Sequence, residues 1–479
     1  MTARLIGGEM VAWSDLDGEH GPGPVSAAAL RPLLASASGR TLVAGPHDPE
    51  LLDSLPSEQL TLLARGLPDA ELLAGRFAGR PEVTVLCGSL EKLAAAPAYD
   101  TVVALDGLGR LRSAEDEAAG DSWADDLARL VAVLRPGGRL LLGLENLFGL
   151  YRLLAPAPEP SDADWSAAGE FDPTRPAAPA QLRAALAAAG LEVLADYAAF
   201  PVAGEPSVLL GPAVLADPAR RGWVTATVRR TLPDDLVALA DPARIVAGAL
   251  RAGIGAELAP AWFVVARRGA GEAAPFPAAI VAGQPDIPDV AALPAGPALD
   301  ELLLGAALRR DQPALRELLT GWQGGDSAGV PADQIVAAAD GTLVPLGPPG
   351  DPAAALRRLA ATMIREGYAY LWPAPADETE LTALLGAMAG REIGEVPAGP
   401  PAGTSRRELI MERDRLTREL AEARAKHQWY ETMLLGREAE LKRVRRINTM
   451  LLATMPGKAA KASYAGLRRA RQAVRKLKG

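Results

Sequence analysis

The stretch Leu134-Arg135-Pro136-Gly137-Gly138-Arg139-Leu140-Leu141-Leu142 connects a predicted helix to a predicted buried strand. Residues 123–134 carry leucines and valines at helical spacing, and the proline and glycines that follow end this helix. Residues 139–144 then form an apolar run with the length of a strand. A helix that leads through a tight turn into a fully apolar strand is typical of a parallel sheet.

Apolar runs and helical stretches alternate in the same way from residue 40 to residue 268. Further strands are predicted at residues 41–44, 60–64, 83–86, 101–105, 191–197 and 262–267, and further helices at residues 69–77 and 179–189. Residues 209–258 are mostly helical in pattern, as an insertion or a cap would be. The alternation predicts an α/β fold of the Rossmann-like kind, with helices on both faces of a mostly parallel sheet.

Two groups of residues resemble class I methyltransferases, which use S-adenosylmethionine. The first is the stretch quoted above together with Tyr99-Asp100-Thr101-Val102-Val103 before it. The second, Glu145-Asn146-Leu147-Phe148-Gly149-Leu150 with the later Tyr197-Ala198-Ala199-Phe200-Pro201, is similar to a bacterial subset encoded with glycosyltransferases and envelope polysaccharide enzymes. The resemblance covers residues 40–268. It implies S-adenosylmethionine as cofactor and, as substrate, a sugar or glycolipid intermediate of cell-envelope polysaccharide synthesis.

The predicted cofactor site lies in the loops after the first strands, because ligands of this fold bind outside the carboxyl ends of the strands. Gly45 would let the backbone approach the cofactor, His47 and Asp48 would offer polar contacts, and Ser89 and Leu90 would flank the adenine. Three features depart from the family pattern. Prolines restrict the first loop, Arg65 stands near the place of the usual acidic residue, and Cys87-Gly88-Ser89 replaces another acidic residue. The alternative is a sheet kept as a scaffold, whose pocket has lost its cofactor contacts.

The candidate catalytic residues follow the fourth and fifth strands. Asp106 is expected near the substrate or the methionine amine, although Asp106-Gly107 also makes an ordinary turn. Glu145 and Asn146 would accept a proton from a sugar hydroxyl or orient it, and their alternative is the polarity of a solvated loop. His47 could act as a general base, but a lone histidine beside two prolines is more often a loop residue.

Composition excludes several classes of protein. Cys87 is the only cysteine and the three histidines lie far apart, so neither a disulfide scaffold nor a zinc cluster is expected. No signal peptide or transmembrane stretch is found, and a cytoplasmic location is expected. The net charge of −9 is uneven, because the residues after Glu440 include twelve lysines and arginines and no acidic residue.

Six segments are predicted along the chain. They are an N-terminal extension (1–39), the methyltransferase-like domain (40–268), a linker (269–298), a small domain with helices and a hairpin (299–395), a coiled coil (404–455) and a basic amphipathic tail (456–479). The small domain has helical stripes at residues 299–319 and 353–364, and a hairpin at residues 334–346 turns at Asp340-Gly341. This hairpin resembles one in kinase-like phosphotransferases, but the metal-binding aspartate expected after it is absent, so phosphotransfer is not expected.

The last two segments predict partners. Taking Leu409 as position d, apolar residues recur at a and d, and polar seam residues such as His427 and Asn448 would help to set the register. We therefore expect a homo-oligomer. In the tail, the apolar residues Tyr464, Leu467, Val474 and Leu477 are expected on one helical face, with basic residues around them. Such a helix fits an anionic membrane surface, and a solvated basic tail is the alternative. Nucleic acid is not expected, since no recognised binding module accompanies the tail.

Two functions remain open from the sequence. The first is a methyltransferase acting on a sugar or glycolipid, held near the inner face of the membrane. The second is a noncatalytic scaffold that assembles polysaccharide-synthesis enzymes through its coiled coil.

Overall fold

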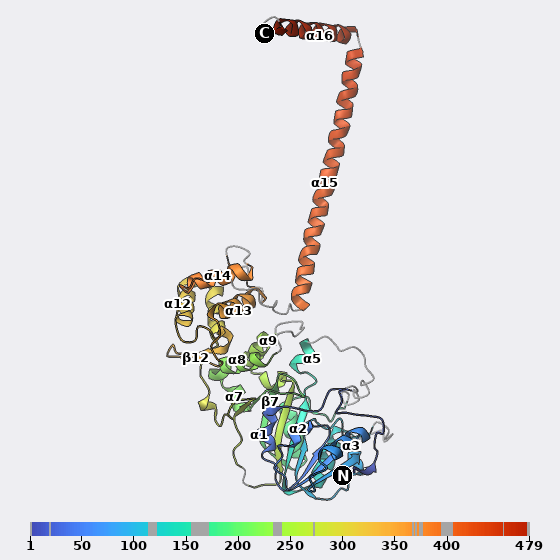
Figure 1. The fold of residues 1–479 in the computed structure, drawn as a ribbon, viewed down its shortest axis with the longest axis vertical. Helices are drawn as coiled ribbons and strands as arrows, with labels where there is room; N and C mark the ends of the chain where they lie inside the picture. Colours follow the sequence, from blue (N-terminus) through green and yellow to red (C-terminus); the bar gives the residue numbers. More distant parts are fainter. Residues whose placement is uncertain are drawn as a thin grey trace. The chain divides into compact units, whose positions relative to one another are not determined.

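The computed structural model describes residues 2–18, 21–113, 122–154, 172–232, 242–271, 274–365, 368, 371–372, 377–393, 406–453 and 455–476. The chain divides into two compact units, Met1–Arg407 and Glu408–Gly479. The first unit contains a ten-stranded sheet with helices beside it and a separate cluster formed by α12 (Gln312–Gln323), α13 (Pro352–Arg365) and α14 (Glu378–Met388) (Figure 1).

The sheet confirms the predicted Rossmann-like architecture. Its strands are β1 (Arg4–Gly7), β2 (Arg40–Ala44), β3 (Gln59–Ala64), β4 (Val83–Gly88), β5 (Tyr99–Ala104), β6 (Leu134–Glu145), β7 (Leu191–Phe200), β8 (Val208–Leu210), β9 (Ala261–Arg268) and β10 (Ala279–Val281). Their order is β1-β4-β3-β2-β5-β6-β9-β7-β8-β10. β9 runs antiparallel to both β6 and β7, so the sheet is mixed. The order reverses between β2 and β5, which is where this class of fold places its ligand crevice.

The turn at Arg135-Pro136-Gly137-Gly138 is a bulge at the start of β6. Tyr99 pairs with Leu134, but Thr101 pairs with Arg139, so residues 135–138 loop out of the ladder between β5 and β6. Gly137 has a φ of +80°, and a Cβ on Gly138 would lie 2.9 Å from the carbonyl oxygens of Arg135 and Asp100. The strand therefore begins at Leu134, five residues before the predicted start at residue 139.

Helices cover both faces of the sheet, and each face has its own apolar core. One core packs β-strand side chains against α1 (Arg31–Leu34), α2 (Pro49–Leu52) and α3 (Leu67–Arg76). The opposite core packs against α4 (Trp123–Val133), α5 (Leu150–Leu154), α6 (Pro179–Ala188), α7 (Pro212–Ala216), α8 (Arg221–Thr231), α9 (Pro242–Ala252) and α10 (Gly255–Leu258). The predicted insertion at residues 209–258 thus supplies β8 and the helices α7 to α10 on one face.

Three strands were not predicted from the sequence. β1 lies in the segment predicted as an N-terminal extension and pairs in parallel with β4 at the edge of the sheet. β8 and β10 pair with each other, and β10 lies in the predicted linker. These strands are only three or four residues long, too short to show a period in the sequence.

The helical cluster after the sheet has a third core around the buried Trp322. Its elements are α11 (Leu299–Leu308), α12 (Gln312–Gln323), β11 (Ile335–Ala337), β12 (Leu343–Pro345), α13 (Pro352–Arg365) and α14 (Glu378–Met388). The predicted hairpin is confirmed, since β11 and β12 pair antiparallel around Gly341 with its φ of +86°. The prediction of helix over residues 299–319 is wrong in one respect, because the structure has two helices there. The chain breaks at Arg310, whose φ is +55°, and Asp311 then caps α12.

The second unit consists of the helices α15 (Arg406–Ala453) and α16 (Met455–Lys476). Wherever their side chains are described, the apolar ones lie exposed, Leu434 by 64% and Tyr464 by 74% for example. The side chain of Leu409 and the residue Leu477 lie outside the described set. Among the described residues no helix is both long enough and apolar enough to cross a membrane.

Candidate functional site

The crevice lies where the carboxyl ends of β2 and β3 meet the end of β5. Gly45, the first residue after β2, has a φ of +91°, a conformation that side chains other than glycine rarely adopt. Its N–H donates to the Leu63 carbonyl at 3.1 Å, and a Cβ there would lie 3.2 Å from the Leu111 side chain. The predicted glycine is therefore needed by the turn itself, and Leu111 occupies the space in front of it.

His47 links the loop after β2 to the end of β5. Its Nδ1 donates to the Gly45 carbonyl at 3.0 Å, and its Nε2 accepts from the Leu105 N–H at 3.1 Å. The side chain is 2% exposed, and burial lowers the pKa of His47 to about 4 although the bond to Gly45 opposes this. Both ring nitrogens thus serve backbone groups, and the neutral ring offers no lone pair to a substrate proton in this arrangement.

Asp48, the next predicted residue, begins a short helix. Its Oδ1 accepts from the Glu50 N–H at 2.7 Å, and its own N–H donates to the Val25 carbonyl at 3.0 Å. The carboxylate therefore acts as an N-cap for α2.

A segment from the N-terminal part of the chain lies across this crevice. We call residues 10–18 and 21–25 the covering segment. Met10 bridges to Gly66 beyond the end of β3, and Val25 bridges to His47 beyond the end of β2. Contact is close at Gly66, where a Cβ would lie 2.3 Å from the Trp13 carbonyl oxygen. The segment is thus packed against the ends of two central strands.

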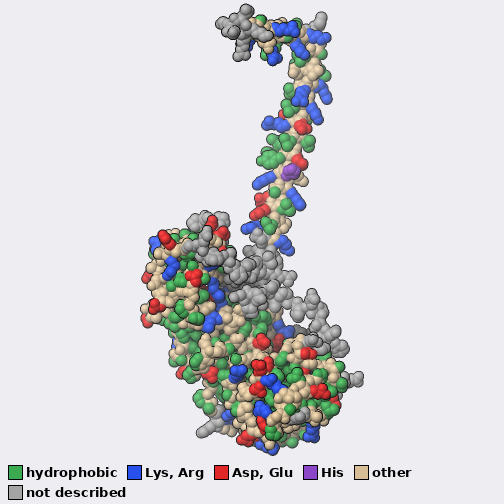
Figure 2. Space-filling view, in the orientation of Figure 1, with side chains coloured by type: hydrophobic (Ala, Val, Ile, Leu, Met, Phe, Trp, Pro, Cys, Tyr) green, Lys and Arg blue, Asp and Glu red, His purple; other side chains and the backbone are tan. Residues whose placement is uncertain are grey.

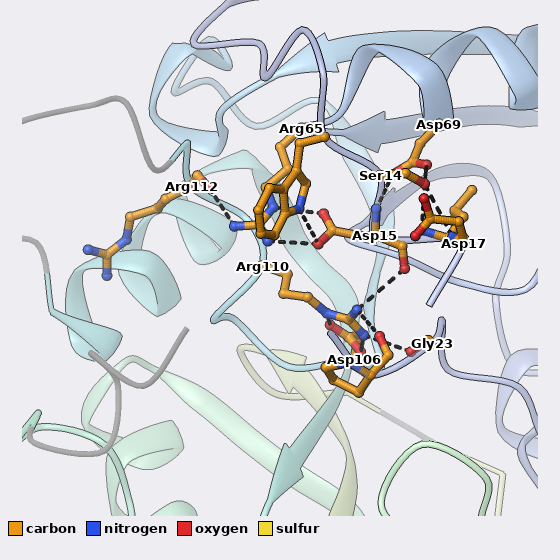
Figure 3. A network of polar contacts seen from close by, with 12 residues as sticks. Ser14, Asp15, Asp17, Gly23, Arg65, Asp69, Asp106, Arg110 and Arg112 are labelled. Atoms are coloured by element: carbon orange, nitrogen blue, oxygen red, sulfur yellow. Dashed lines mark hydrogen bonds and ion pairs between the residues drawn. The ribbon is translucent and has the colours of Figure 1, made fainter. Parts of the chain in front are cut away.

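Asp15 of the covering segment forms a bidentate ion pair with Arg65 (Figure 3). Both bonds measure 2.7 Å, and the side chains are only 5% and 10% exposed. Trp13 Nε1 also donates to the Asp15 carboxylate at 3.0 Å. Burial alone would raise the pKa of Asp15, but the bonds and charge of Arg65 outweigh it, so the pKa lies below its ordinary value. Arg65, which stands near the predicted place of a ribose-binding carboxylate, is therefore neutralised by the chain itself.

A second ion pair joins Asp106 to Arg110 beneath the covering segment (Figure 3). Arg110 Nε donates to Asp106 Oδ2 at 2.8 Å, and the guanidinium also donates to the carbonyls of Pro22 at 2.5 Å and Gly23 at 3.0 Å. Burial raises the pKa of Asp106 to about 6 against the opposing effect of Arg110. The predicted catalytic carboxylate is thus buried and engaged by a residue four positions later.

Asp69 completes the polar network. It accepts from the Ser14 hydroxyl at 2.5 Å and from the Asp15 N–H at 2.8 Å (Figure 3). Burial raises the pKa of Asp69, although these hydrogen bonds oppose the shift. Two arginines and three aspartates therefore bind the covering segment to the body of the fold.

The space left in the crevice does not fit S-adenosylmethionine. The cavity bounded by Asp15, Gly45, His47, Arg65 and Arg110 has a volume of about 10 Å³. That is roughly the space of one water molecule, whereas sites for small organic ligands measure about 300–1,000 Å³. A cofactor could enter only if the covering segment left. The predicted cofactor contacts stay predictions for such an open state.

The other predicted cofactor residues lie at the end of β4. Leu90 is part of the apolar core, and its N–H donates to the Leu111 carbonyl at 2.9 Å. Ser89 is fully buried, and its N–H donates to the Gly7 carbonyl of β1 at 3.0 Å. Neither residue lines the small cavity.

Glu145 and Asn146 stand at the end of β6, and they differ from each other. Asn146 is buried, and its Nδ2 donates to the carbonyls of Glu257 at 2.6 Å and Ala259 at 2.8 Å. Its Oδ1 accepts from the Phe148 N–H at 3.0 Å, so the whole side-chain amide holds backbone together. Glu145 is 45% exposed and pairs with Arg152 at 3.0 Å. In the described part of the chain, no hydrogen bond or ion pair joins Asp106 to either residue.

Sequence reasoning missed Asp15, Trp13, Asp69 and Arg110. The only available signal was the spacing of Asp106 and Arg110, which lie four residues apart. Nothing local marks Asp15, because its partner Arg65 is 50 residues away. No group of His, Cys, Asp and Glu among the described residues could hold a metal ion.

Comparison with known proteins adds the following. No family model matches the chain, and no curated protein sequence does. Solved structures with similar folds include the [4+2]-cyclase SpnF (17% identity, 51% of this chain and 81% of that chain, TM-score 0.27). Another is an S-adenosylmethionine-dependent methyltransferase from Mesorhizobium loti (15% identity, 50% of this chain and 98% of that chain, TM-score 0.27). A third is the N-methyltransferase NodS from Bradyrhizobium japonicum in complex with S-adenosyl-L-homocysteine (19% identity, 25% of this chain and 59% of that chain, TM-score 0.21).

These identities and TM-scores are too low to transfer an activity or a ligand. The fold class follows from the strand order given above, with β9 reversed between β6 and β7. It is a Rossmann-like fold of the methyltransferase type.

Proposed function

We propose that this chain is a methyltransferase-like protein that works as a noncatalytic scaffold for enzymes of cell-envelope polysaccharide synthesis. The observation that carries the proposal is the Asp15–Arg65 ion pair inside a crevice of about 10 Å³. The polysaccharide setting rests on the resemblance of the Glu145-Asn146 region to its bacterial subset.

Opening the crevice would be costly. Without the covering segment, Arg65 would lose Asp15, and Arg110 would lose its bonds to Pro22 and Gly23. Water would solvate the freed groups, so the net cost is about 1.5–3 kcal/mol for each of these hydrogen bonds to a charged group. An arginine has no acceptor for the hydroxyl hydrogens of a ribose, and the charge of Arg65 without Asp15 disfavours a cationic sulfonium. The crevice residues therefore favour their own chain over this cofactor.

Calorimetry on the full chain tests the proposal with S-adenosylmethionine and S-adenosyl-L-homocysteine. We expect no heat of binding from either ligand at concentrations up to about 1 mM, which corresponds to roughly 4 kcal/mol of binding free energy. Binding of either ligand by the wild-type chain would overturn the scaffold proposal.

A methyltransferase acting on a sugar or glycolipid is the second candidate, and the strand order favours it. In that case a partner or substrate displaces the covering segment, and the Asp106 carboxyl, which is buried in the closed crevice, becomes available for proton transfer. The double variant Trp13→Ala/Asp15→Ala weakens the attachment of the segment. Cofactor binding by this variant but not by the wild type would favour the gated enzyme, and binding by neither favours the scaffold.

We also propose that α15 brings copies of the chain together. Its exposed apolar side chains recur along the helix at coiled-coil positions, among them Leu420, Leu434 and Leu441. Light scattering of the full chain should give a dimer or larger oligomer, and Leu434→Asp/Leu441→Asp should give a monomer. Glu422→Gln, at an exposed c position on the outer face of the same helix, is the matched control. A wild-type monomer would refute this part.

For α16 we propose a peripheral contact with an anionic membrane surface. Lys and Arg side chains are distributed over the helices of this unit (Figure 2), and Tyr464, Leu467 and Val474 lie within one face of α16. Each basic residue near anionic headgroups contributes about 1 kcal/mol. The full chain should sediment with phosphatidylserine vesicles and not with neutral ones, and Arg468→Gln/Arg469→Gln/Arg471→Gln should weaken sedimentation. Equal sedimentation with both vesicles would contradict the proposal.

A further inference from the structure

A second cavity lies on the other side of the fold from α1, α2 and α3. It has a volume of about 520 Å³ and is bounded by α6 and by the helices α7, α9 and α10. This volume falls within the range of about 300–1,000 Å³ that is usual for small-molecule sites. It shares no lining residue with the closed crevice.

The floor of this cavity is a row of side chains across three strands. Trp262 of β9 pairs with Ala198 of β7, and Ala198 pairs with Leu210 of β8. Residues paired directly across neighbouring strands point to the same face of a sheet. Ala198, with its single methyl group, therefore lies between two large side chains on the floor of the cavity, and all three side chains are nearly fully buried.

The walls above this floor are apolar. Leu182 comes from α6, Leu215 from α7 and Leu250 from α9, and all three pack with the core of this face. Trp262 has its Nε1 committed to the Ala256 carbonyl at 2.7 Å, so the indole presents carbon atoms rather than a free donor. An apolar group that lies against the three leucines and the indole would contact carbon atoms there.

Basic residues stand among the lining residues nearer to solvent. Arg183 is paired with Asp196, Nε to Oδ2, at 2.9 Å. Arg221 and Arg251 are different, because neither has a hydrogen bond or an ion pair within the described ranges. Both act on Glu301 of α11: burial raises the pKa of Glu301, and the charges of Arg251 and Arg221 oppose this. Both arginines also line the cavity itself.

Acidic residues balance part of this positive charge. Glu301 is influenced by both Arg221 and Arg251. Asp217 is held by Arg220 at 3.3 Å, and Asp196 by Arg183. Glu257 is exposed at the rim. The cavity thus combines an apolar interior with two arginines that can form bidentate bonds to phosphate or carboxylate.

We propose that this cavity binds a small amphipathic molecule, with an anionic group such as a phosphate held by Arg221 and Arg251 and an apolar body on the floor at Ala198. The site is independent of the crevice at β2 and β3, and it needs no S-adenosylmethionine.

Calorimetry of the full chain tests the proposal with three probes, each below its aggregation concentration: decyl phosphate, inorganic phosphate and decanol. Decyl phosphate should bind at least about tenfold more tightly than either of the others, since it alone uses both parts of the cavity. Arg221→Gln and Arg251→Gln should each weaken its binding by about tenfold, the usual effect of losing a hydrogen bond to a charged group. Ala198→Leu should weaken binding, because it adds three carbon atoms to the floor of the cavity.

Arg31→Gln is the matched control, because Arg31 is an exposed arginine of α1 on the opposite face of the sheet. It should bind decyl phosphate as the wild type does. Circular dichroism and thermal midpoints identify variants that fail to fold, and the two arginine variants keep the test decisive if Ala198→Leu is one of them. The proposal is overturned if decyl phosphate does not bind, if decanol binds as tightly, or if both arginine variants bind like the wild type.

Discussion

His47 should make the stability of the sheet depend on pH. In the unfolded chain its pKa is near the ordinary value of 6.5, whereas burial lowers the pKa of the folded side chain to about 4. Between these two values the unfolded chain takes up a proton that the folded chain refuses, so stability falls as the pH falls through this window. From pH 7.5 to pH 5.0 the loss attributable to this group is about 2 kcal/mol.

His47→Gln isolates this effect, because glutamine does not titrate. Hydrogen exchange of the most protected amides in β2 and β5 reports the free energy of opening the sheet, and is measured for both proteins at both pH values. We expect the variant to be less stable at pH 7.5, since the bridge between Gly45 and Leu105 is weakened. The stability gap should narrow by about 2 kcal/mol at pH 5.0. Asp106, whose raised pKa gives the opposite dependence, is present in both proteins and cancels in the comparison. A gap that is the same at both pH values would refute the reasoning.

Three further predictions concern stability. Arg65→Ala leaves the Asp15 carboxylate buried without its partner and should cost about 3–5 kcal/mol in thermal or urea unfolding, and Asp15→Ala/Arg65→Ala should recover part of that loss; no recovery would contradict the pairing. Asn146→Ala removes three hydrogen bonds to backbone and should lower stability by about 1–3 kcal/mol, while Asn146→Asp should restore only the acceptor bond; an unchanged melting midpoint for the alanine variant would count against it. Gly222→Ala places a Cβ 2.4 Å from the Gly296 carbonyl oxygen and should speed proteolysis between the sheet and the helical cluster, whereas Gly248→Ala on α9, with nothing within 4 Å, should not.

The sheet was predictable because its central strands are continuous apolar runs. The predicted strands at residues 41–44 and 101–105 match β2 and β5 closely. Both faces of these strands are buried, so nearly every residue in them is apolar and the run is visible in the sequence. The short edge strands β1, β8 and β10 carry too few residues for any period. Their places in the sheet depend on pairing with distant strands.

The site was predictable only where function and turn geometry coincide. Gly45 was predicted to let the backbone approach a cofactor, and the structure shows that the turn after β2 needs this glycine for its positive φ. His47, Asp48 and Asn146 were expected to meet ligands, but their hydrogen bonds go to backbone groups, which local sequence does not reveal. Arg65 was recognised as unusual from its place after the second strand, yet its partner could come only from the folded chain.

The placement of β1 limits how the covering segment can be studied. β1 shields the open edge of β4, and exposed strand edges promote pairing between molecules. A truncation that removes the covering segment from the N-terminal side removes β1 as well. It would therefore expose the edge of β4 and uncover the crevice at the same time. Loss of solubility in such a deletion would then be mistaken for a requirement of the site. Substitutions within residues 10–18 leave β1 paired with β4. They therefore separate the effect of opening the crevice from the effect of exposing a strand edge.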